Sequence, residues 1–369
     1  MDLSPGACRQ SGLMQGVRAV PEAILEPDLP IVDPHHHLWD RLGGAGSPLP
    51  PQPSGPVHPF TQVVARSPRY LADNLLADMK SGHNIVATVF VQCGAMYRAD
   101  GPDHLKPVGE TEFVNGVAAM TASGIYGPVR ACAGIVGHAD CTTGAKVDET
   151  LQAHLKVSDR FRGIRHSCSS DPDPGVLGPL ARQTPGLYLS DVFRDGYARL
   201  AKYGLSFDAW LLEPQLPELY DLVKRYPDIP VVLDHVGTPL GLASYEGRRE
   251  ERFGVWRDNI RRLADLPHVN VKLGGLAMAF CNFPSFMAEP PASSAQLASD
   301  WKPYLETCIE AFGPSRCMFE SNFPVDLGSC DYPTLWNAFK VFAKDYSAAE
   351  KADLFAGTAT RVYRLDLPN

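Results

Sequence analysis

Segments of helical periodicity alternate with short apolar runs along most of this 369-residue chain. Residues 71–79 have helical spacing, Gly82 can cap that helix, and the near-continuous apolar run 85–91 follows. A buried apolar strand after each helix is typical of a parallel sheet that helices cover. The later pairs of expected helix and strand are 113–123 with 129–136, 147–157 with 161–166, 192–203 with 205–208, 216–226 with 229–233, 253–266 with 269–273, and 301–312 with 316–319.

The segment 31–37, where a short apolar run leads into an acidic residue and three histidines, is a further expected strand. It brings the expected strands to about eight, which favours a (β/α)8 barrel, the TIM-barrel fold, over an open doubly wound sheet. No shift in composition marks a boundary, so we expect one barrel domain over residues 29–369. Residues 1–28 lack periodicity and are expected to form an N-terminal arm. No glycine-rich phosphate-binding motif follows any strand, which gives nucleotide binding no support.

The composition narrows the class of partner. A net charge of −8 without a basic run argues against nucleic acid and against an anionic membrane surface, so a small-molecule substrate is expected. The nine cysteines are scattered without a C-x-x-C motif, which favours reduced thiols and a cytoplasmic location. No stretch resembles a signal peptide or a membrane-spanning helix. The sequence leaves the oligomeric state open, a homo-oligomer included.

Six prolines between Gly43 and Pro59 exclude a helix or a central strand there. A long irregular loop directly after a motif-bearing strand is typical of a functional lid, with a solvated linker as the equally weighted alternative.

The first strand ends in three consecutive histidines, His35, His36 and His37. In an extended chain, a period of two places His35 and His37 on one face while His36 points away. Two neutral imidazoles side by side would form half of a site for zinc or a similar divalent metal. The alternative is a pair of histidines that are solvated or satisfied by hydrogen bonds in the core.

Polar residues follow nearly every expected strand, although the strands themselves are apolar. In a barrel the carboxyl ends of the strands meet at one mouth, where active sites are built. We therefore expect these residues to converge, although His138 or His166 taken singly would more commonly be a hydrogen-bonded core residue. The strand-end residues are His35 to His37, Gln92 and Cys93 with Tyr97 beyond, His138, Arg165 and His166, Asp208 and Trp210, Asp234 and His235, Lys272, and Glu320 to Asn322.

Five motifs resemble the amidohydrolase-related family that includes pyrone-dicarboxylate lactonase and sugar lactonases. The motifs are Asp33-Pro34-His35-His36-His37-Leu38-Trp39-Asp40, Arg162-Gly163-Ile164-Arg165-His166, Val232-Leu233-Asp234-His235-Val236-Gly237-Thr238-Pro239, Val271-Lys272-Leu273-Gly274-Gly275 and Met318-Phe319-Glu320-Ser321-Asn322-Phe323-Pro324. The resemblance runs in the family's order from about residue 30 to the segment 357–363 near the C-terminus. The resemblance implies a barrel whose site includes His35, His37 and His235. Members differ in whether they hold a divalent metal, so both a zinc site on these histidines and metal-independent hydrolysis are implied.

The last motif departs from the family pattern, which ends the eighth strand with an aspartate where this chain has Asn322. An amide cannot act as a general base, although its oxygen can ligate or orient water. Glu320, two residues earlier on the same face of the strand, or Asp326 on the next loop could supply the missing carboxylate. A structural ion pair of Glu320 with Lys272 or Arg165 is the alternative.

These observations predict a hydrolase that attacks a small lactone or related cyclic ester or amide, from a carboxylated or aromatic metabolite, with a histidine-held water. Glu320 or Asp326 would accept the proton, and Asn322 and His235 belong to the same site. We expect Arg165 to bind a substrate carboxylate. The pocket is expected to be lined by His138, His166, Tyr97, Trp210 and Trp39. A metal-dependent non-oxidative decarboxylase and a catalytically inactive small-molecule binder are the alternatives.

Overall fold

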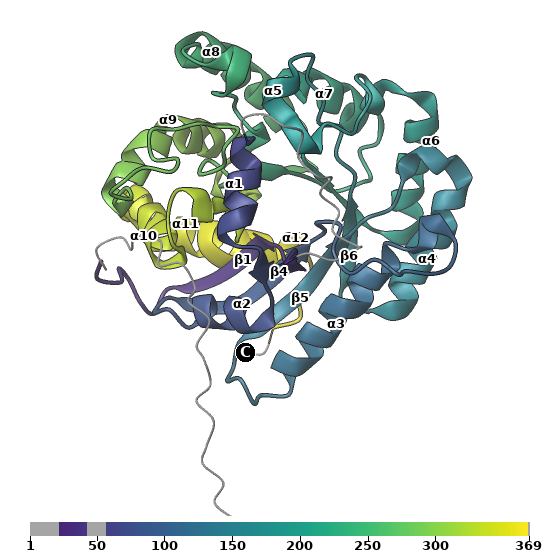
Figure 1. Ribbon diagram of the computed structural model, residues 1–369, viewed down its shortest axis with the longest axis horizontal. Helices are drawn as coiled ribbons and strands as arrows, with labels where there is room; N and C mark the ends of the chain where they lie inside the picture. Colours follow the sequence, from purple (N-terminus) through teal and green to yellow (C-terminus); the bar gives the residue numbers. More distant parts are fainter. Residues whose placement is uncertain (1–21, 43–56, 368–369) are drawn as a thin grey trace, which may run out of the picture.

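The computed structural model describes residues 22–42 and 57–367, in which eight parallel strands form a ring. Neighbours in the ring are neighbours in the sequence, as a (β/α)8 barrel requires (Figure 1). The predicted fold class is confirmed. The barrel strands are β1 (Pro30–His36), β4 (Asn84–Val91), β5 (Arg130–Gly137), β6 (Phe161–Arg165), β7 (Ser206–Ala209), β8 (Val231–Leu233), β9 (Val269–Leu273) and β10 (Cys317–Phe319).

The ring closes just beyond the end of β10. The amide of Asn322 donates to the carbonyl of His35 at 2.8 Å, and the amide of His37 donates to the carbonyl of Phe323 at 2.7 Å. The buried carboxylate of Asp33 adds a side-chain bridge across this seam, because it accepts hydrogen bonds from the hydroxyl of Ser321 at 2.6 Å and from its amide at 2.9 Å. The segment after β10 is thereby fixed against the strand that carries the histidines.

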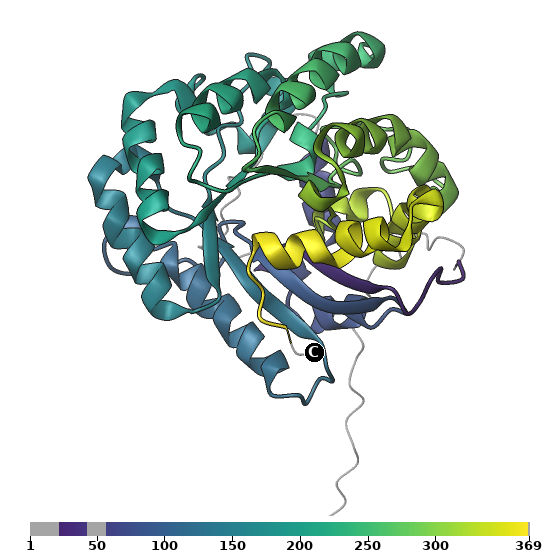
Figure 2. The ribbon, with the colours of Figure 1, turned by 180° about the vertical axis from the view of Figure 1, so that it is seen from behind.

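The helices cover the outside of the ring (Figures 1 and 2). Helices α3, α8 and α9 begin further toward the N-terminus than predicted: α8 starts at Arg249 rather than at Phe253, and α9 at Ser294 rather than at Trp301. The charged first turn of α8 carries no apolar periodicity, so the pattern omits it. The outer helices are α2 (Ala72–Met79), α3 (Val108–Ala122), α4 (Val147–Val157), α6 (Asp191–Tyr203), α7 (Leu216–Arg225), α8 (Arg249–Ala264), α9 (Ser294–Phe312) and α10 (Tyr332–Phe342).

Two expectations about turn residues need correction. Helix α2 ends at Met79 with Lys80 as its C-cap, so Gly82 does not cap it. Gly82 has φ +122°, and a Cβ there would lie 2.8 Å from Ile24, so the close approach of the arm requires the glycine. Pro59, counted with the loop, is the first residue of α1 (Pro59–Arg66), where a helix needs no amide donor.

The two ends of the barrel are covered differently. Helices α11 (Ala348–Ala352) and α12 (Thr358–Val362) cross the end seen in Figure 2, where Tyr363 packs with valines of the strands. Helix α1 lies over the opposite end (Figure 1), beside an apolar cluster that contains Trp39, Met278 and Phe280. This second end is where the carboxyl ends of the strands and their loops meet.

The arm packs on the barrel where it is described. Glu22 accepts from the amide of Ser294 at 2.8 Å, and Lys340 donates to the carbonyl of Leu25 at 2.8 Å. The remaining arm residues, 1–21, and loop residues 43–56 lie outside the described residues. In the part of the chain that is described, no helix combines the length and apolar character needed to cross a bilayer.

Candidate active site

The end of β1 presents its histidines as the period of two predicts. The rings of His35 and His37 lie 4.9 Å apart between centroids on the inner face. His36 points the other way, where its Nε2 lies 2.8 Å from the hydroxyl of Thr88 in the core. His35 and His37 thus belong to the mouth of the barrel, and His36 is structural.

Glu320 follows β10 and joins two of the predicted histidines. One carboxylate oxygen, Oε1, accepts from Nδ1 of His235 at 2.7 Å and from the His235 amide at 3.1 Å. The other, Oε2, lies 2.8 Å from Nδ1 of His35 but has no hydrogen bond of acceptable angle, although it is fully buried. Burial opposes the charge of Glu320, but His235 and His35 outweigh it and lower the pKa of the carboxyl to about 2.

Gly275 allows this contact to form. A Cβ on Gly275, which has φ +65°, would lie 2.5 Å from the His235 ring. His235 itself has φ 56°, an uncommon conformation for a residue with a side chain, in the short helical turn after β8. The backbone around both residues is therefore shaped to set the ring against Glu320.

Buried charges of both signs lie behind His35. The ammonium of Lys272 contacts Asp208 at 2.7 Å and Asp234 at 3.0 Å, and it lies 3.1 Å from Nδ1 of His35. Burial and the charge of Lys272 lower the pKa of His35 to about 4, so the ring is neutral at pH 7. Lys272 has these two aspartates as its partners, so the structure does not show the alternative ion pair of Lys272 with Glu320.

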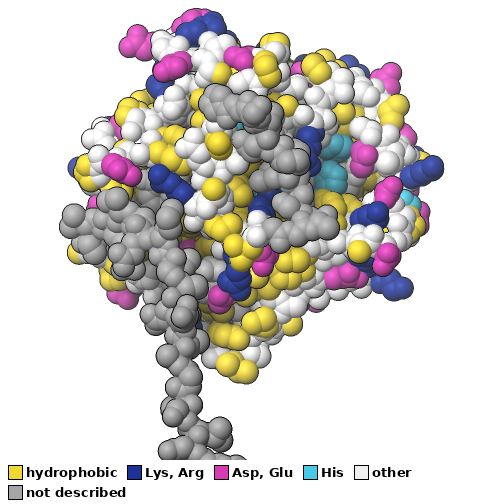
Figure 3. Space-filling view, in the orientation of Figure 1, with side chains coloured by type: hydrophobic (Ala, Val, Ile, Leu, Met, Phe, Trp, Pro, Cys, Tyr) yellow, Lys and Arg dark blue, Asp and Glu magenta, His cyan; other side chains and the backbone are white. Residues whose placement is uncertain are grey.

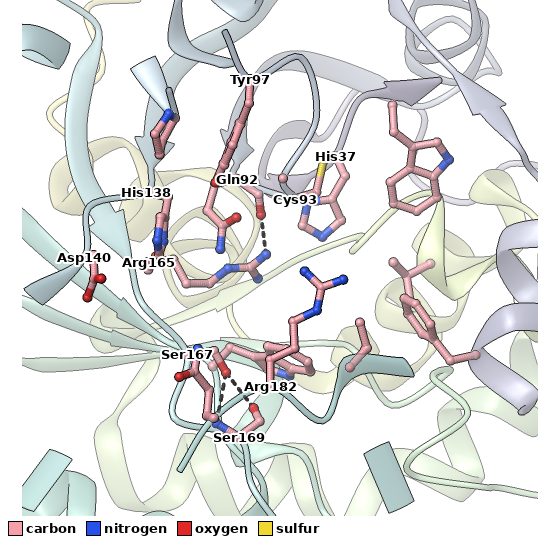
Figure 4. A pocket seen from close by; sticks show the side chains of 18 of the residues that line it. His37, Gln92, Cys93, Tyr97, His138, Asp140, Arg165, Ser167, Ser169 and Arg182 are labelled. Carbon is pink, nitrogen blue, oxygen red and sulfur yellow. Dashed lines mark hydrogen bonds between the residues drawn. The ribbon is translucent and has the colours of Figure 1, made fainter. Parts of the chain in front are cut away.

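Arg165 is held inside the protein. Its Nη1 lies 3.3 Å from Asp234 and 3.3 Å from Nε2 of His35, and its Nη2 donates to the carbonyl of Gln92 (Figure 4). Both terminal nitrogens of the guanidinium therefore already have acceptors. The Nε of Arg165 is buried and has no hydrogen-bond acceptor among the described residues.

His37 stands at the wall of the site but outside the closest group of donor atoms. Within the described residues, that group comprises His35, His235 and Glu320, whose ligand atoms lie within 4.8 Å of one another. Nδ1 of His37 lies 2.8 Å from the carbonyl of Val91, which fixes the tautomer and leaves Nε2 with a lone pair. Burial and the neighbouring His35 hold the pKa of His37 well below its ordinary value.

Asn322 and Asp326, the other predicted site residues near β10, contact each other. The amide nitrogen of Asn322 donates to Oδ1 of Asp326 at 2.7 Å, and both side chains are buried. Oδ2 of Asp326 has no hydrogen-bond partner among the described residues, and burial holds the pKa of this carboxyl well above its ordinary value. Asn322 lines the cavity described next, whereas Asp326 lies behind it.

A cavity of about 840 Å³ opens at this mouth. His37, His235 and Asn322 lie in its wall, with His35 and Glu320 behind them, and Figure 4 shows His37, Gln92, Tyr97 and Arg165 around one space. On the face seen in Figure 3, a group of histidine side chains lies to the right of the centre, with a Lys or Arg side chain beside it. The predicted pocket residues that line the cavity are Trp39, Tyr97, His138, Arg165 and Trp210.

His166 differs from this group, because it is buried behind the wall, where Nδ1 accepts from the amide of Cys141 at 3.2 Å. Two arginines at the cavity were missed by sequence reasoning. Arg41 follows Trp39, and Arg182 extends into the space from the loop after β6 (Figure 4). The period of two that places His37 and Trp39 on one face also places Arg41 there, and this is the only sequence signal for Arg41 at the cavity. No sequence pattern marks Arg182.

The family model described as Amidohydrolase matches residues 32–365, which is almost the whole barrel. The chain belongs to the amidohydrolase family. It is accordingly a hydrolase, as the motifs predict, and the mouth of the barrel is the place where this amidohydrolase carries His35, His37 and His235.

Similar proteins cover most of this amidohydrolase. An uncharacterized protein, y4mH, of Sinorhizobium fredii is 33% identical over 92% of the chain and 99% of its own length. An L-fucono-1,5-lactonase of Burkholderia multivorans is 32% identical over 57% of the chain and 64% of its own length. The second similarity agrees with the predicted lactonase branch of the family.

Solved structures support the same fold. A crystal structure of an amidohydrolase from Burkholderia multivorans with bound zinc is 28% identical over 91% of this chain and 99% of its own, with a TM-score of 0.67. A 2,6-dihydroxybenzoate decarboxylase is 15% identical over 91% and 99% of the two chains, with a TM-score of 0.53. At that identity the second likeness concerns the fold alone.

Proposed function

We propose that this amidohydrolase opens a small lactone, from a carboxylated or aromatic metabolite, by attack of water on the ring carbonyl. The observation that carries the proposal is the buried hydrogen bond between Glu320 and Nδ1 of His235 at the cavity wall. The similarity to an L-fucono-1,5-lactonase supports a lactone as the substrate class. The absence of a basic surface run supports a small molecule, and the unpaired thiols of the described residues support a cytoplasmic location.

The sequence predicts that one carboxylate accepts the proton of the attacking water. We infer instead that His235 accepts the proton and that Glu320 orients His235. A carboxylate whose pKa is about 2 is a weak base at neutral pH, so Glu320 is poorly suited to take the proton itself. It is well suited to orient His235 and to stabilise the imidazolium that forms, because its charge lies against Nδ1. We assign the proton transfer to Nε2 of His235, the nitrogen that Glu320 leaves available.

Each step then has a group in place. The water oxygen bonds to the carbonyl carbon while His235 takes one water proton, and His37 accepts a hydrogen bond from the same water at Nε2. Arg165 supplies positive charge to the developing oxyanion. When the carbon–oxygen bond of the ring breaks, His235 returns the proton to the leaving alkoxide, and the product is a hydroxy acid.

The residues also fit a divalent metal. Oε2 of Glu320 is a buried anionic oxygen without a hydrogen bond, close to the nitrogens of two histidines, which is a donor set that suits zinc. His35, His235 and Glu320 would hold it, with His37 beside them. A bound zinc ion would lower the pKa of a water and polarise the carbonyl. The zinc-bound relative supports this version of the site, and hydrolysis by the chain's own residues is the alternative.

The experiment is turnover of a lactone panel in isotopically labelled water. We expect one labelled oxygen to enter the new carboxylate of the product. Release of carbon dioxide from carboxylic acids without label uptake would instead indicate the decarboxylase. Ligand-dependent thermal stabilisation without turnover of any compound would indicate a binding protein.

A further inference from the structure

The extended chain that carries the site histidines continues outward along one face of the cavity. Its alternate side chains are His37, Trp39 and Arg41. The ring of His37 stacks on that of Trp39 with 6.0 Å between centroids, and the guanidinium of Arg41 lies 4.8 Å above the Trp39 ring. All three line the cavity. We call these three stacked side chains the ladder. Its inner end is the ring of His37 beside the other site histidines, and its outer end is the guanidinium of Arg41.

The outer part of the ladder is held in place. Strand β2 (Trp39–Asp40) pairs with β3 (Arg69–Tyr70), and the amide of Arg41 donates to the carbonyl of Pro68 at 2.6 Å. The indole nitrogen of Trp39 donates to the carbonyl of Ser67 at 2.8 Å. Arg41 is therefore a preorganised cation.

Among the described residues, the guanidinium of Arg41 has no anionic partner. Its Nη2 donates to the carbonyl of Cys93 at 3.1 Å, and Nε is buried without an acceptor in the part of the chain that the structure describes. No carboxylate of the described residues lies within 4 Å of it, in contrast to Arg165, which is paired with Asp234. A buried donor without an acceptor destabilises a protein, so a ligand that supplies the acceptor gains the corresponding interaction.

We propose that Arg41 binds an oxyanion on the substrate, remote from the carbonyl that is attacked, while the body of the substrate lies along Trp39. The assignment rests on the proposed lactone hydrolysis and narrows it to anionic lactones with an apolar frame. It replaces Arg165, which the sequence favoured for this role, because the terminal nitrogens of Arg165 are already occupied by Asp234, His35 and Gln92. A carboxylate and a phosphate both have the required geometry.

The test compares dihydrocoumarin carrying a carboxylate on its benzene ring with the matching carboxamide. We expect wild-type protein to favour the carboxylate by about 10-fold or more in kcat/KM, chiefly through KM, as a charged hydrogen-bonded pair provides. Arg41→Met should remove this preference and Arg41→Lys should retain part of it. Lys146→Met and Arg182→Met, which alter other cations of the same cavity, should keep the preference. A preference that survives Arg41→Met, or that follows either control, overturns the assignment.

Calorimetry with benzoate, phenyl phosphate and benzamide separates this inference from the lactonase proposal. Benzoate binding that is lost in Arg41→Met, without turnover of any lactone, retains the oxyanion site and rejects lactone hydrolysis. Turnover of the two dihydrocoumarins by wild-type protein with equal kcat/KM retains lactone hydrolysis and rejects the oxyanion site. Binding of phenyl phosphate in preference to benzoate, again dependent on Arg41, identifies the oxyanion as a phosphate. Equal binding of benzoate and benzamide overturns the assignment.

Discussion

The carboxylate of Glu320 lies 2.7 Å from Nδ1 of His235, and both side chains are buried at the mouth of the barrel. The family pattern has an aspartate two residues further on, where this chain has Asn322. The carboxylate of Glu320 therefore contacts His235 on the side away from the cavity and does not line the cavity itself. An anion in that place acts on the reaction through the imidazole.

Glu320→Gln keeps the size of the side chain but removes its charge. We expect kcat to fall by about 100-fold or more, because the imidazolium of His235 then loses its counter-charge. Steady-state kinetics and circular dichroism check the change and the fold. Glu213→Gln is the matched control, since Glu213 is also buried but is paired with Arg252 outside the cavity. Near-wild-type kcat in Glu320→Gln would remove the residue from the mechanism.

Removal of metal tests the donor set of His35, His235 and Glu320. We expect protein prepared without a histidine tag to bind Zn²⁺, and Glu320→Gln to bind it at least about 10-fold more weakly. Calorimetric titration of chelator-treated protein measures both affinities without reference to activity. Equal zinc affinity in wild type and Glu320→Gln would show that the carboxylate is not a ligand.

Asn322→Asp introduces the family residue but should not improve the protein. The new carboxyl would lie against that of Asp326, whose pKa burial already holds well above its ordinary value, so a second buried acid there opposes ionisation of both groups. We expect a lower melting temperature by thermal denaturation, and recovery when Asp326→Asn is added to the same chain. A single variant as stable as wild type would show that the two side chains are not coupled as the hydrogen bond indicates.

His154 gives a pH-dependent contribution to stability outside the candidate site. Its ring stacks on Phe161 and Nδ1 lies 2.8 Å from the hydroxyl of Thr111, and burial lowers its pKa to about 4. The unfolded chain takes up a proton near pH 6.5 that the folded state resists, so the contribution of His154 is complete above about pH 6.5 and is lost as the pH falls toward 4.

Urea unfolding of wild type and of His154→Gln measures the free energy of unfolding of each protein as a function of pH. We expect the advantage of wild type in free energy of unfolding to shrink by about 2 kcal/mol between about pH 7.5 and pH 5. Because both proteins share every other titrating group, the difference isolates His154. An advantage that is constant over this range would mean that the ring takes up its proton equally well in the folded state.

The sequence predicted which residues meet, but not how they pair. His35, His37 and His235 were placed correctly at one mouth, because strand ends in a barrel converge whatever the loops do. The pairing of Glu320 with His235, and of Lys272 with Asp208 and Asp234, depends on the distances between neighbouring strands. Periodicity along one strand carries no information about these distances. Arg182 could not be found at all, since it lies in an irregular loop.

The sequence by itself determined the barrel and the end at which its chemistry lies, because apolar periodicity selects strands and helices and their alternation leaves few topologies. The tertiary structure decided the role of each charge. Burial, strand spacing and the seam between Asp33 and Ser321 set which carboxylate faces which histidine. For the same reasons Arg165 is held by Asp234, whereas Arg41 has no carboxylate partner among the described residues.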